Sequence, residues 1–134
     1  MDLVSEIMSA NPVCCTPVTR IEEIERLMKE QNTEEIPIVD TLYEKNFLGI
    51  ITEKEITKRA DEDGVKHSEL NTEQCMTLNP ITVYAESSID ECFRLMDSNH
   101  LTQIPVIDGG GHICGIVERS AKEIKPEAKA KIKN

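Results

Sequence analysis

Two stretches of thirty residues decide the fold: NPVCCTPVTRIEEIERLMKEQNTEEIPIVD at residues 11–40 and NPITVYAESSIDECFRLMDSNHLTQIPVID at residues 79–108. A shift of 68 residues aligns them without a gap and gives ten identities in the thirty positions. Beyond residue 40 the offset between the copies decreases from 68 to 66 residues, and Gly49-Ile50-Ile51 aligns with Gly115-Ile116-Val117. The chain is therefore an internal duplication, and each copy is predicted to be one structural unit.

Each copy is predicted to follow the order strand, helix, strand, strand, helix. In copy one, Thr19 and Glu22 form a capping-box pattern ahead of an amphipathic helix, and in copy two Ser87 or Ser88 begins the corresponding helix. The strands are expected at 13–16, 36–39 and 47–51 in copy one and at 81–84, 104–107 and 113–117 in copy two. A last helix is expected from Thr52 in copy one and near Arg119 in copy two.

The predicted fold class is α+β, with two βαββα repeats. A unit of this length is marginally stable alone, so we expect the two copies to stack and share a core. The expected boundaries are 1–60 for the first repeat, 61–68 for a polar linker, 69–125 for the second repeat and 126–134 for a basic, frayed tail.

Charge and hydropathy exclude several classes of protein. The net charge is −10, and because residues 121–134 carry a local charge of +3, the first 120 residues carry −13. Nucleic acids and anionic membrane surfaces repel so acidic a body, so we expect neither as a partner. The N-terminus lacks the basic region and apolar core of a signal peptide, and the apolar runs are far shorter than the ~20 residues of a membrane span. We therefore expect a cytoplasmic protein.

The motifs common to both copies resemble those of a known family. They are Met-x-x-x-Pro at 8–12 and 76–80, an Ile-Pro strand closed by Asp at 36–40 and 104–108, and Gly-Ile at 49–50 and 115–116. Their order, spacing and duplication, over residues 1 to about 125, resemble a pair of cystathionine-β-synthase (CBS) domains, a stand-alone Bateman-type module. The resemblance implies repeats packed sheet to sheet with pseudo-two-fold symmetry, two clefts between them, and a homodimer.

The same resemblance implies a function. The chain would be a non-catalytic regulatory module that senses an adenosine-type ligand, namely AMP, ADP, ATP or S-adenosylmethionine, and signals to a separate, unknown effector protein. No cofactor is required. The alternative is a dimeric interaction or scaffold module whose clefts are vestigial and bind no ligand. An enzyme is not expected, because no set of catalytic groups can be assembled from the sequence.

Relatives that bind nucleotides hold the ribose through Asp in a Thr/Ser-x-x-Asp motif after the third strand. Copy one has Thr52-Glu53-Lys54-Glu55, in which Thr52 fits and Glu55 supplies a carboxylate one methylene too long. A carboxylate accepts from both ribose hydroxyls, the strand-to-helix turn offers N–H donors to a phosphate, and Lys54 could meet that phosphate. The alternative is that Thr52 is an N-cap with Glu55 in a capping box, and both can hold together.

The adenine of such a ligand is expected against the first strand and the Ile-Pro strand. The candidates in copy one are Asn11, Pro12, Val13, Ile36 and Pro37. For each of them ordinary core or turn structure is the alternative. Relatives often carry Arg or His before the Ile-Pro pair, whereas this chain has Glu34-Glu35 and Thr102-Gln103. Two acids there would repel a triphosphate, which favours adenosine, AMP or S-adenosylmethionine over ATP, unless both are surface loop charges.

The second cleft is expected to be weaker or empty. The corresponding motif reads Glu118-Arg119-Ser120-Ala121 and lacks both the hydroxyl and the ribose carboxylate. The candidate residues of this cleft are Asn79, Pro80, Ile81, Ile104, Pro105, Glu118 and Arg119.

The cysteines are not expected to form disulfides or a metal site. Their number, five, is odd, and a chain of this size does not need disulfide bonds for stability, so we expect them to be reduced. His112-x-Cys114 and the pair Cys14-Cys15 lack the spacing of metal ligands. Cys92 and Cys114 occupy core positions and are interpreted as small hydrophobic residues.

Overall fold

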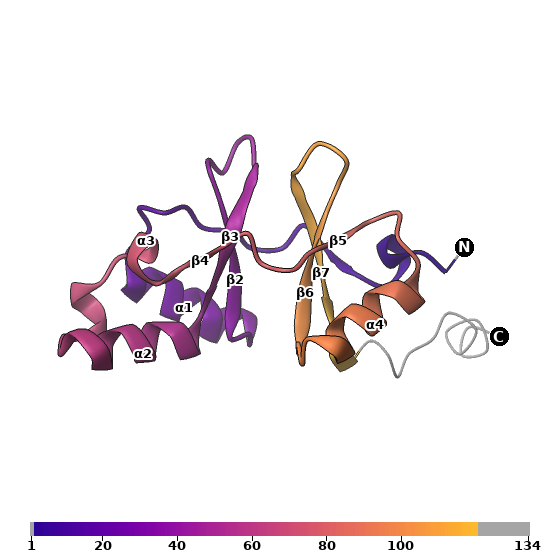
Figure 1. The fold of residues 1–134 in the computed structure, drawn as a ribbon. Helices are drawn as coiled ribbons and strands as arrows, with labels where there is room; N and C mark the ends of the chain where they lie inside the picture. The colour runs from indigo at the N-terminus through magenta and orange to yellow at the C-terminus, as the bar shows by residue number, and fades with distance from the viewer. Residues whose placement is uncertain (1, 121–134) are drawn as a thin grey trace. The chain divides into compact units, whose positions relative to one another are not determined.

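The computed structural model describes residues 2–120, which fall into two compact units (Figure 1). Unit 2 is the continuous segment Val13–Pro80, and unit 1 combines the described residues of Met1–Pro12 and Ile81–Asn134. The chain therefore leaves unit 1 after Pro12 and returns to it after Pro80. Both crossings fall at the Asn-Pro pairs that mark the duplication, so each repeat gives its first residues to the unit built by the other repeat.

Unit 2 contains a three-stranded antiparallel sheet in the order β2 (Glu35–Val39), β3 (Phe47–Thr52) and β4 (Thr77–Leu78). Its helices are α1 (Ile21–Gln31), α2 (Glu53–Asp63) and the short α3 (Thr72–Cys75), with a 3-10 turn at His67–Glu69. The strands predicted at 36–39 and 47–51 are confirmed. The run expected at 13–16 makes one parallel bridge, from Cys15 to Ile38, instead of a full strand.

Unit 1 contains a four-stranded sheet in the order β1 (Ser9–Ala10), β7 (Ile113–Glu118), β6 (Gln103–Ile107) and β5 (Val83–Tyr84). β5 runs parallel to β6, and the other pairs are antiparallel. The unit also contains α4 (Ile89–Ser98) and a 3-10 turn at Val4–Glu6. The described residues end at Ser120, so all but the start of the last helix expected near Arg119, and the whole tail at 126–134, lie outside them.

The repeated glycine of the Gly-Ile motif lies where a short edge strand from the other repeat pairs with the sheet. Gly49 in β3 faces Leu78 of β4, and Gly115 in β7 faces Ala10 of β1. A Cβ on Gly49 would collide with the carbonyl oxygen of Thr77, and one on Gly115 would collide with the side chain of Met8. The motif is therefore explained by close packing, and it needs no role in ligand binding.

Buried side chains form two hydrophobic clusters, one in each unit. In unit 2, Ile24 of α1 and Ile36 of β2 are at most 1% exposed. In unit 1, Met96 of α4 and Ile104 of β6 are fully buried. Each such side chain contributes about 1.5–3 kcal/mol when it leaves water, so each unit has a hydrophobic driving force of its own.

The helix starts agree only in part with the predictions. Ser88 caps α4, because its Oγ accepts a hydrogen bond from the Glu91 amide at 3.1 Å, as predicted. The capping box predicted at Thr19 is wrong: α1 begins at Ile21, and the hydroxyl oxygen of Thr19 accepts instead from the Thr16 amide at 3.0 Å. The carbonyl of Thr19 also accepts a 2.6 Å bond from the Thr72 hydroxyl, which is a tertiary contact.

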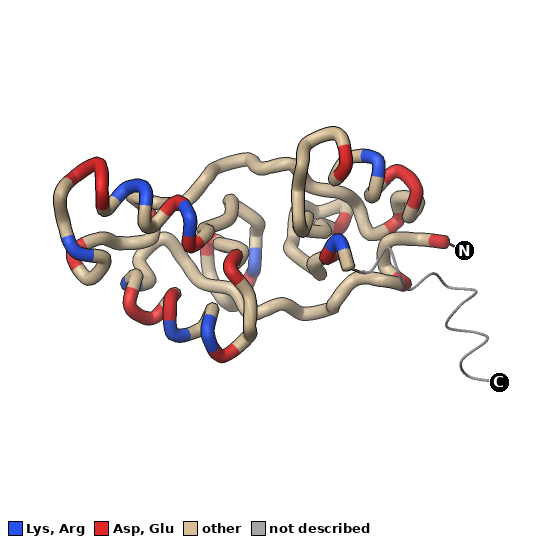
Figure 2. The backbone as a smooth tube through the Cα atoms, turned by 90° about the horizontal axis from the view of Figure 1, so that it is seen from below, with Lys and Arg blue, Asp and Glu red and all other residues tan. Residues whose placement is uncertain are grey.

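Helix α2 continues into the segment that the sequence assigned to a linker. It includes residues 61–63 and ends at Gly64, whose φ of 65° is the left-handed conformation that glycine adopts without strain. Both α1 and α2 carry acidic and basic residues (Figure 2). None of the helices found between residues 2 and 120 has the length and apolar content that crossing a bilayer requires.

Candidate functional site

Thr52 joins β3 to α2 and is the N-cap of that helix. Its Oγ1 accepts a hydrogen bond from the Glu55 amide at 3.1 Å. The N-cap interpretation of Thr52 is therefore confirmed. A hydroxyl has one proton and two lone pairs, so this bond leaves Thr52 able to donate once and to accept once more. Lys54 is exposed and Glu55 is half-buried.

Glu35 lies opposite Thr52 in the β2–β3 pair. Its side chain is half-buried in a strand, so the interpretation of both acids as surface loop charges is right only for the exposed Glu34. Burial raises the pKa of the Glu35 carboxyl from 4.5 to about 7. Near neutral pH Glu35 therefore carries only part of a negative charge, and its protonated form can donate a hydrogen bond.

The structure brings six of the eight candidate residues of copy one into unit 2. They are Val13, Ile36, Pro37, Thr52, Lys54 and Glu55. Ile36 belongs to the hydrophobic core, so its alternative, a structural role, is confirmed. Pro37 is buried, and its carbonyl accepts from the Cys15 amide at 3.1 Å. The remaining two, Asn11 and Pro12, belong to unit 1.

The two Asn-Pro pairs have the same local geometry. Asn11 and Asn79 adopt left-handed backbone conformations, with φ of 51° and 49°. The Asn11 amide donates to the Cys114 carbonyl at 3.2 Å, and the Asn79 amide donates to the Leu48 carbonyl at 3.3 Å. Asn tolerates positive φ better than other non-glycine residues. Its recurrence therefore has a conformational reason at each crossing.

The candidates of the second cleft are also divided between the units. Asn79 and Pro80 are in unit 2, whereas Ile81, Ile104, Pro105, Glu118 and Arg119 are in unit 1. Ile104 is a core residue. Glu118 is exposed at the end of β7, where Thr52 stands in the other repeat.

Arg119 holds the end of β7 against α4 and the loop that follows it. Its guanidinium forms a 2.6 Å ion pair with Asp97, and its Nε donates to the Leu101 carbonyl at 3.3 Å. Its backbone amide donates to the Thr102 carbonyl at 2.8 Å. The guanidinium of Arg119, at the end of β7, is therefore already bound by groups of unit 1. The last residue of the copy-two motif, Ala121, lies beyond the described residues.

Three of the five cysteines are core residues. Cys15, Cys75 and Cys92 are buried reduced thiols. Burial raises the pKa of Cys15 and of Cys92 to about 11, so both are protonated at neutral pH. Cys114 is half-buried, and its thiol donates to the Val106 carbonyl at 3.4 Å. Protonated thiols are poor nucleophiles and poor metal ligands.

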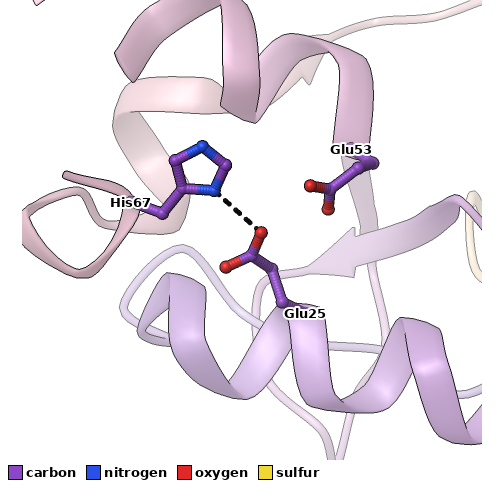
Figure 3. A group of neighbouring side chains, drawn as sticks. All are labelled: Glu25, Glu53 and His67. Atoms are coloured by element: carbon purple, nitrogen blue, oxygen red, sulfur yellow. Dashed lines mark hydrogen bonds and ion pairs between the residues drawn. The ribbon is translucent and has the colours of Figure 1, made fainter.

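Sequence reasoning missed a group of three side chains in unit 2. Glu25 from α1, Glu53 from the start of α2 and His67 from the following turn point toward one another (Figure 3). Their ligand atoms all lie within 4.8 Å of one another, and Nδ1 of His67 is 2.8 Å from a carboxylate oxygen of Glu25. The three come from separate segments, so no local spacing could indicate the group.

Comparison with known proteins identifies the duplicated unit. The CBS domain family matches residues 4–62 and 72–121. YlbB of Bacillus subtilis, an uncharacterized protein, is 32% identical over 106 residues, which are 79% of this chain and 70% of that protein. Inosine-5'-monophosphate dehydrogenase of Streptococcus pyogenes and homoserine O-acetyltransferase of Methanosalsum zhilinae are 22% and 29% identical. The matching regions cover 80% and 85% of this chain but only about a fifth of those enzymes, 21% and 22%.

Solved structures share the fold. The CBS domain pair of protein MJ0100, in complex with 5'-methylthioadenosine and S-adenosyl-L-methionine, is 29% identical with a TM-score of 0.76 over 91% of this chain and 93% of that one. CBSX2 of Arabidopsis thaliana, in complex with AMP, has a TM-score of 0.76 at 19% identity and matches both chains over their full length.

Proposed function

Because this chain belongs to the CBS domain family and contains two copies of the domain, we propose that it is a non-catalytic regulatory module. In this proposal an adenosine-type ligand binds at the β3–α2 junction of unit 2, and the occupied state is recognised by a separate effector protein. The module acts as a homodimer. The observation that carries the proposal is the 29% identity to a CBS pair that binds 5'-methylthioadenosine and S-adenosyl-L-methionine.

The chemistry of the junction supports this ligand class. The Thr52 hydroxyl and the Glu55 carboxylate adjoin the N-terminus of the eleven-residue helix α2. The first amides of a helix and its dipole favour an anion such as a phosphate, and a carboxylate accepts from ribose hydroxyls. Lys54 is exposed at the same turn.

The charges nearby select among adenosine compounds. Glu34 is exposed and Glu35 adds a partial charge, so a triphosphate meets more repulsion than AMP or the positively charged S-adenosylmethionine. We therefore rank AMP and S-adenosylmethionine above ADP and ATP as ligands.

Two observations favour the alternative, a dimeric scaffold without a ligand. The Thr52 hydroxyl already caps α2, and Arg119 of the second repeat is engaged by Asp97. The polar groups after β3 and after β7 thus already make contacts within the protein, as expected for clefts that bind no ligand.

A thermal-shift screen of the full chain separates the two functions. AMP, ADP, ATP and S-adenosylmethionine are each added at up to millimolar concentration. A ligand at 100 times its Kd stabilises the folded state by about 2.7 kcal/mol, which raises the Tm by several degrees. A rise with AMP or S-adenosylmethionine supports the sensing module. No rise with any of the four contradicts it and leaves the scaffold.

A further inference from the structure

We propose that Glu25, Glu53 and His67 form a binding site for one divalent transition-metal ion, with zinc as the representative ion. The three side chains lie within unit 2 (Figure 3). The site is distinct from the Thr52 and Glu55 groups discussed above, although Glu53 directly follows Thr52 in the chain.

The backbone of each ligand is held by a defined element. Glu25 stands on α1 beside Ile24, which is fully buried. Glu53 is the first residue of α2, and its amide donates to the Glu34 carbonyl at 3.0 Å. His67 begins a 3-10 turn. Because three separate elements each supply one donor, the donors do not depend on one flexible loop.

The distances suit a small cation. Donor atoms around a tetrahedral zinc ion, each about 2.0–2.2 Å from it, lie about 3.3–3.6 Å apart. The His67 nitrogen and the Glu25 oxygen are 2.8 Å apart, and all three donors lie within 4.8 Å. Small side-chain rotations would move the His67 nitrogen and the Glu25 oxygen slightly apart and bring the Glu53 carboxylate closer. All three side chains would then contact the metal ion. The remaining position would hold water.

The charges of the group favour a cation as well. Two carboxylates face a single imidazole, and the carboxylates of Glu34 and Asp61 lie close enough to add to the negative potential. The side chains of Glu25 and His67 are 30% and 35% exposed, so water screens the repulsion only in part. A divalent ion would neutralise both carboxylates and would replace the proton shared by His67 and Glu25.

The donor set indicates the class of metal. An imidazole nitrogen with two carboxylate oxygens suits zinc and its neighbours in the first transition row, whereas magnesium and calcium prefer oxygen ligands alone. We therefore expect zinc to bind in the presence of a large excess of magnesium.

The test is zinc titration of the full-length chain in competition with a chromophoric chelator, under reducing conditions and with excess magnesium. The variants are Glu53→Gln and His67→Gln. The matched control is His112→Gln, because His112 also faces a carboxylate, at 3.1 Å from Asp108, but among residues 2–120 it has no third metal-ligating side chain beside it. We expect one zinc ion per chain, affinity lowered roughly tenfold or more in both variants, and no change in the control.

Two further readouts keep the test decisive if a variant is unstable. Zinc should shift the ring nitrogen resonances of His67 and leave those of His100 and His112 unchanged. Glu53→Gln should raise the Tm without metal, because it removes like-charge repulsion, but should lower the additional rise that zinc produces. Wild-type zinc affinity in both variants, an equal loss in the control, or unshifted His67 resonances would overturn the proposal.

Discussion

Glu35 of β2 lies opposite Thr52, the residue that ends β3 and caps α2. A half-buried carboxyl group with a pKa raised to about 7 thus stands beside the proposed ligand site. The pH dependence of stability is therefore linked to the β3–α2 junction of unit 2, which is the proposed ligand site.

Stability should fall as the pH rises through neutrality. Burial raises the pKa of Glu35 from 4.5 to about 7, so between these values the folded state binds more protons than the unfolded state. The free energy of unfolding therefore decreases from about pH 5 to pH 8, by on the order of 2 kcal/mol from this group. Urea unfolding at several pH values measures it.

Glu35→Gln should remove this decrease and be more stable than the wild type at pH 8. The exposed neighbour provides the control, because Glu34→Gln should leave the decrease intact. An unchanged pH profile in Glu35→Gln would show that another group is responsible.

Thr52 should contribute to stability through its cap. Thr52→Ala removes the oxygen that accepts from the Glu55 amide and should cost about 1 kcal/mol in the free energy of unfolding. Thr52→Ser keeps that oxygen and should retain most of the stability. Denaturant melts of the two variants without ligand give the comparison, and equal stability of both would contradict the cap.

Gly49→Ala should be more destabilising than an exposed glycine change. A Cβ at Gly49 meets the backbone carbonyl of Thr77, which cannot move without breaking the β3–β4 pair, whereas a Cβ at Gly109 meets nothing within 4 Å. We expect a loss of roughly 1–3 kcal/mol for Gly49→Ala and less than about 0.5 kcal/mol for Gly109→Ala. Similar melting curves for the two would contradict the close approach.

The chain should self-associate. We expect a CBS pair to bury its exposed helix faces in a homodimer. We expect the dissociation constant of that dimer to lie below tens of micromolar, as for an interface of standard size. Sedimentation equilibrium should give about twice the monomer mass of 15.1 kDa. A single 15.1 kDa species at that concentration would contradict the dimer.

The duplication and the pattern of short apolar runs predicted most of the fold. The expected strands coincide with β2, β3, β6 and β7. A continuous run of apolar residues bounded by turns indicates a buried strand, and all four have this pattern. Local capping was predicted correctly where nothing competes, at Ser88. It failed at Thr19, because hydrogen bonds to Thr72, 53 residues away, hold that segment in another conformation.

The candidate site was harder to predict, for physical reasons. Thr52 was found because a hydroxyl at a strand-to-helix turn has a local signature. The crossings at Pro12 and Pro80 divide the predicted ligand residues between the units, and nothing in a contiguous pattern shows where a chain changes unit. The sequence leaves open whether Glu35 is a surface loop charge, because burial is set by the surrounding fold. The group of Glu25, Glu53 and His67 depends on tertiary packing alone.

The proposed ligand site is tested by titration calorimetry of AMP and S-adenosylmethionine into the wild type, Thr52→Ala, Glu55→Ala and Glu55→Asp. We expect one site per chain, at the β3–α2 junction of unit 2. Loss of either polar group leaves a buried ribose hydroxyl or phosphate without its partner, which costs ~1–3 kcal/mol and lowers affinity about ten- to hundredfold. Glu55→Asp should retain or tighten binding, because it restores the shorter carboxylate of the family motif. Binding that survives both alanine substitutions, or no binding of either compound at millimolar concentration, would contradict a ligand site at this junction.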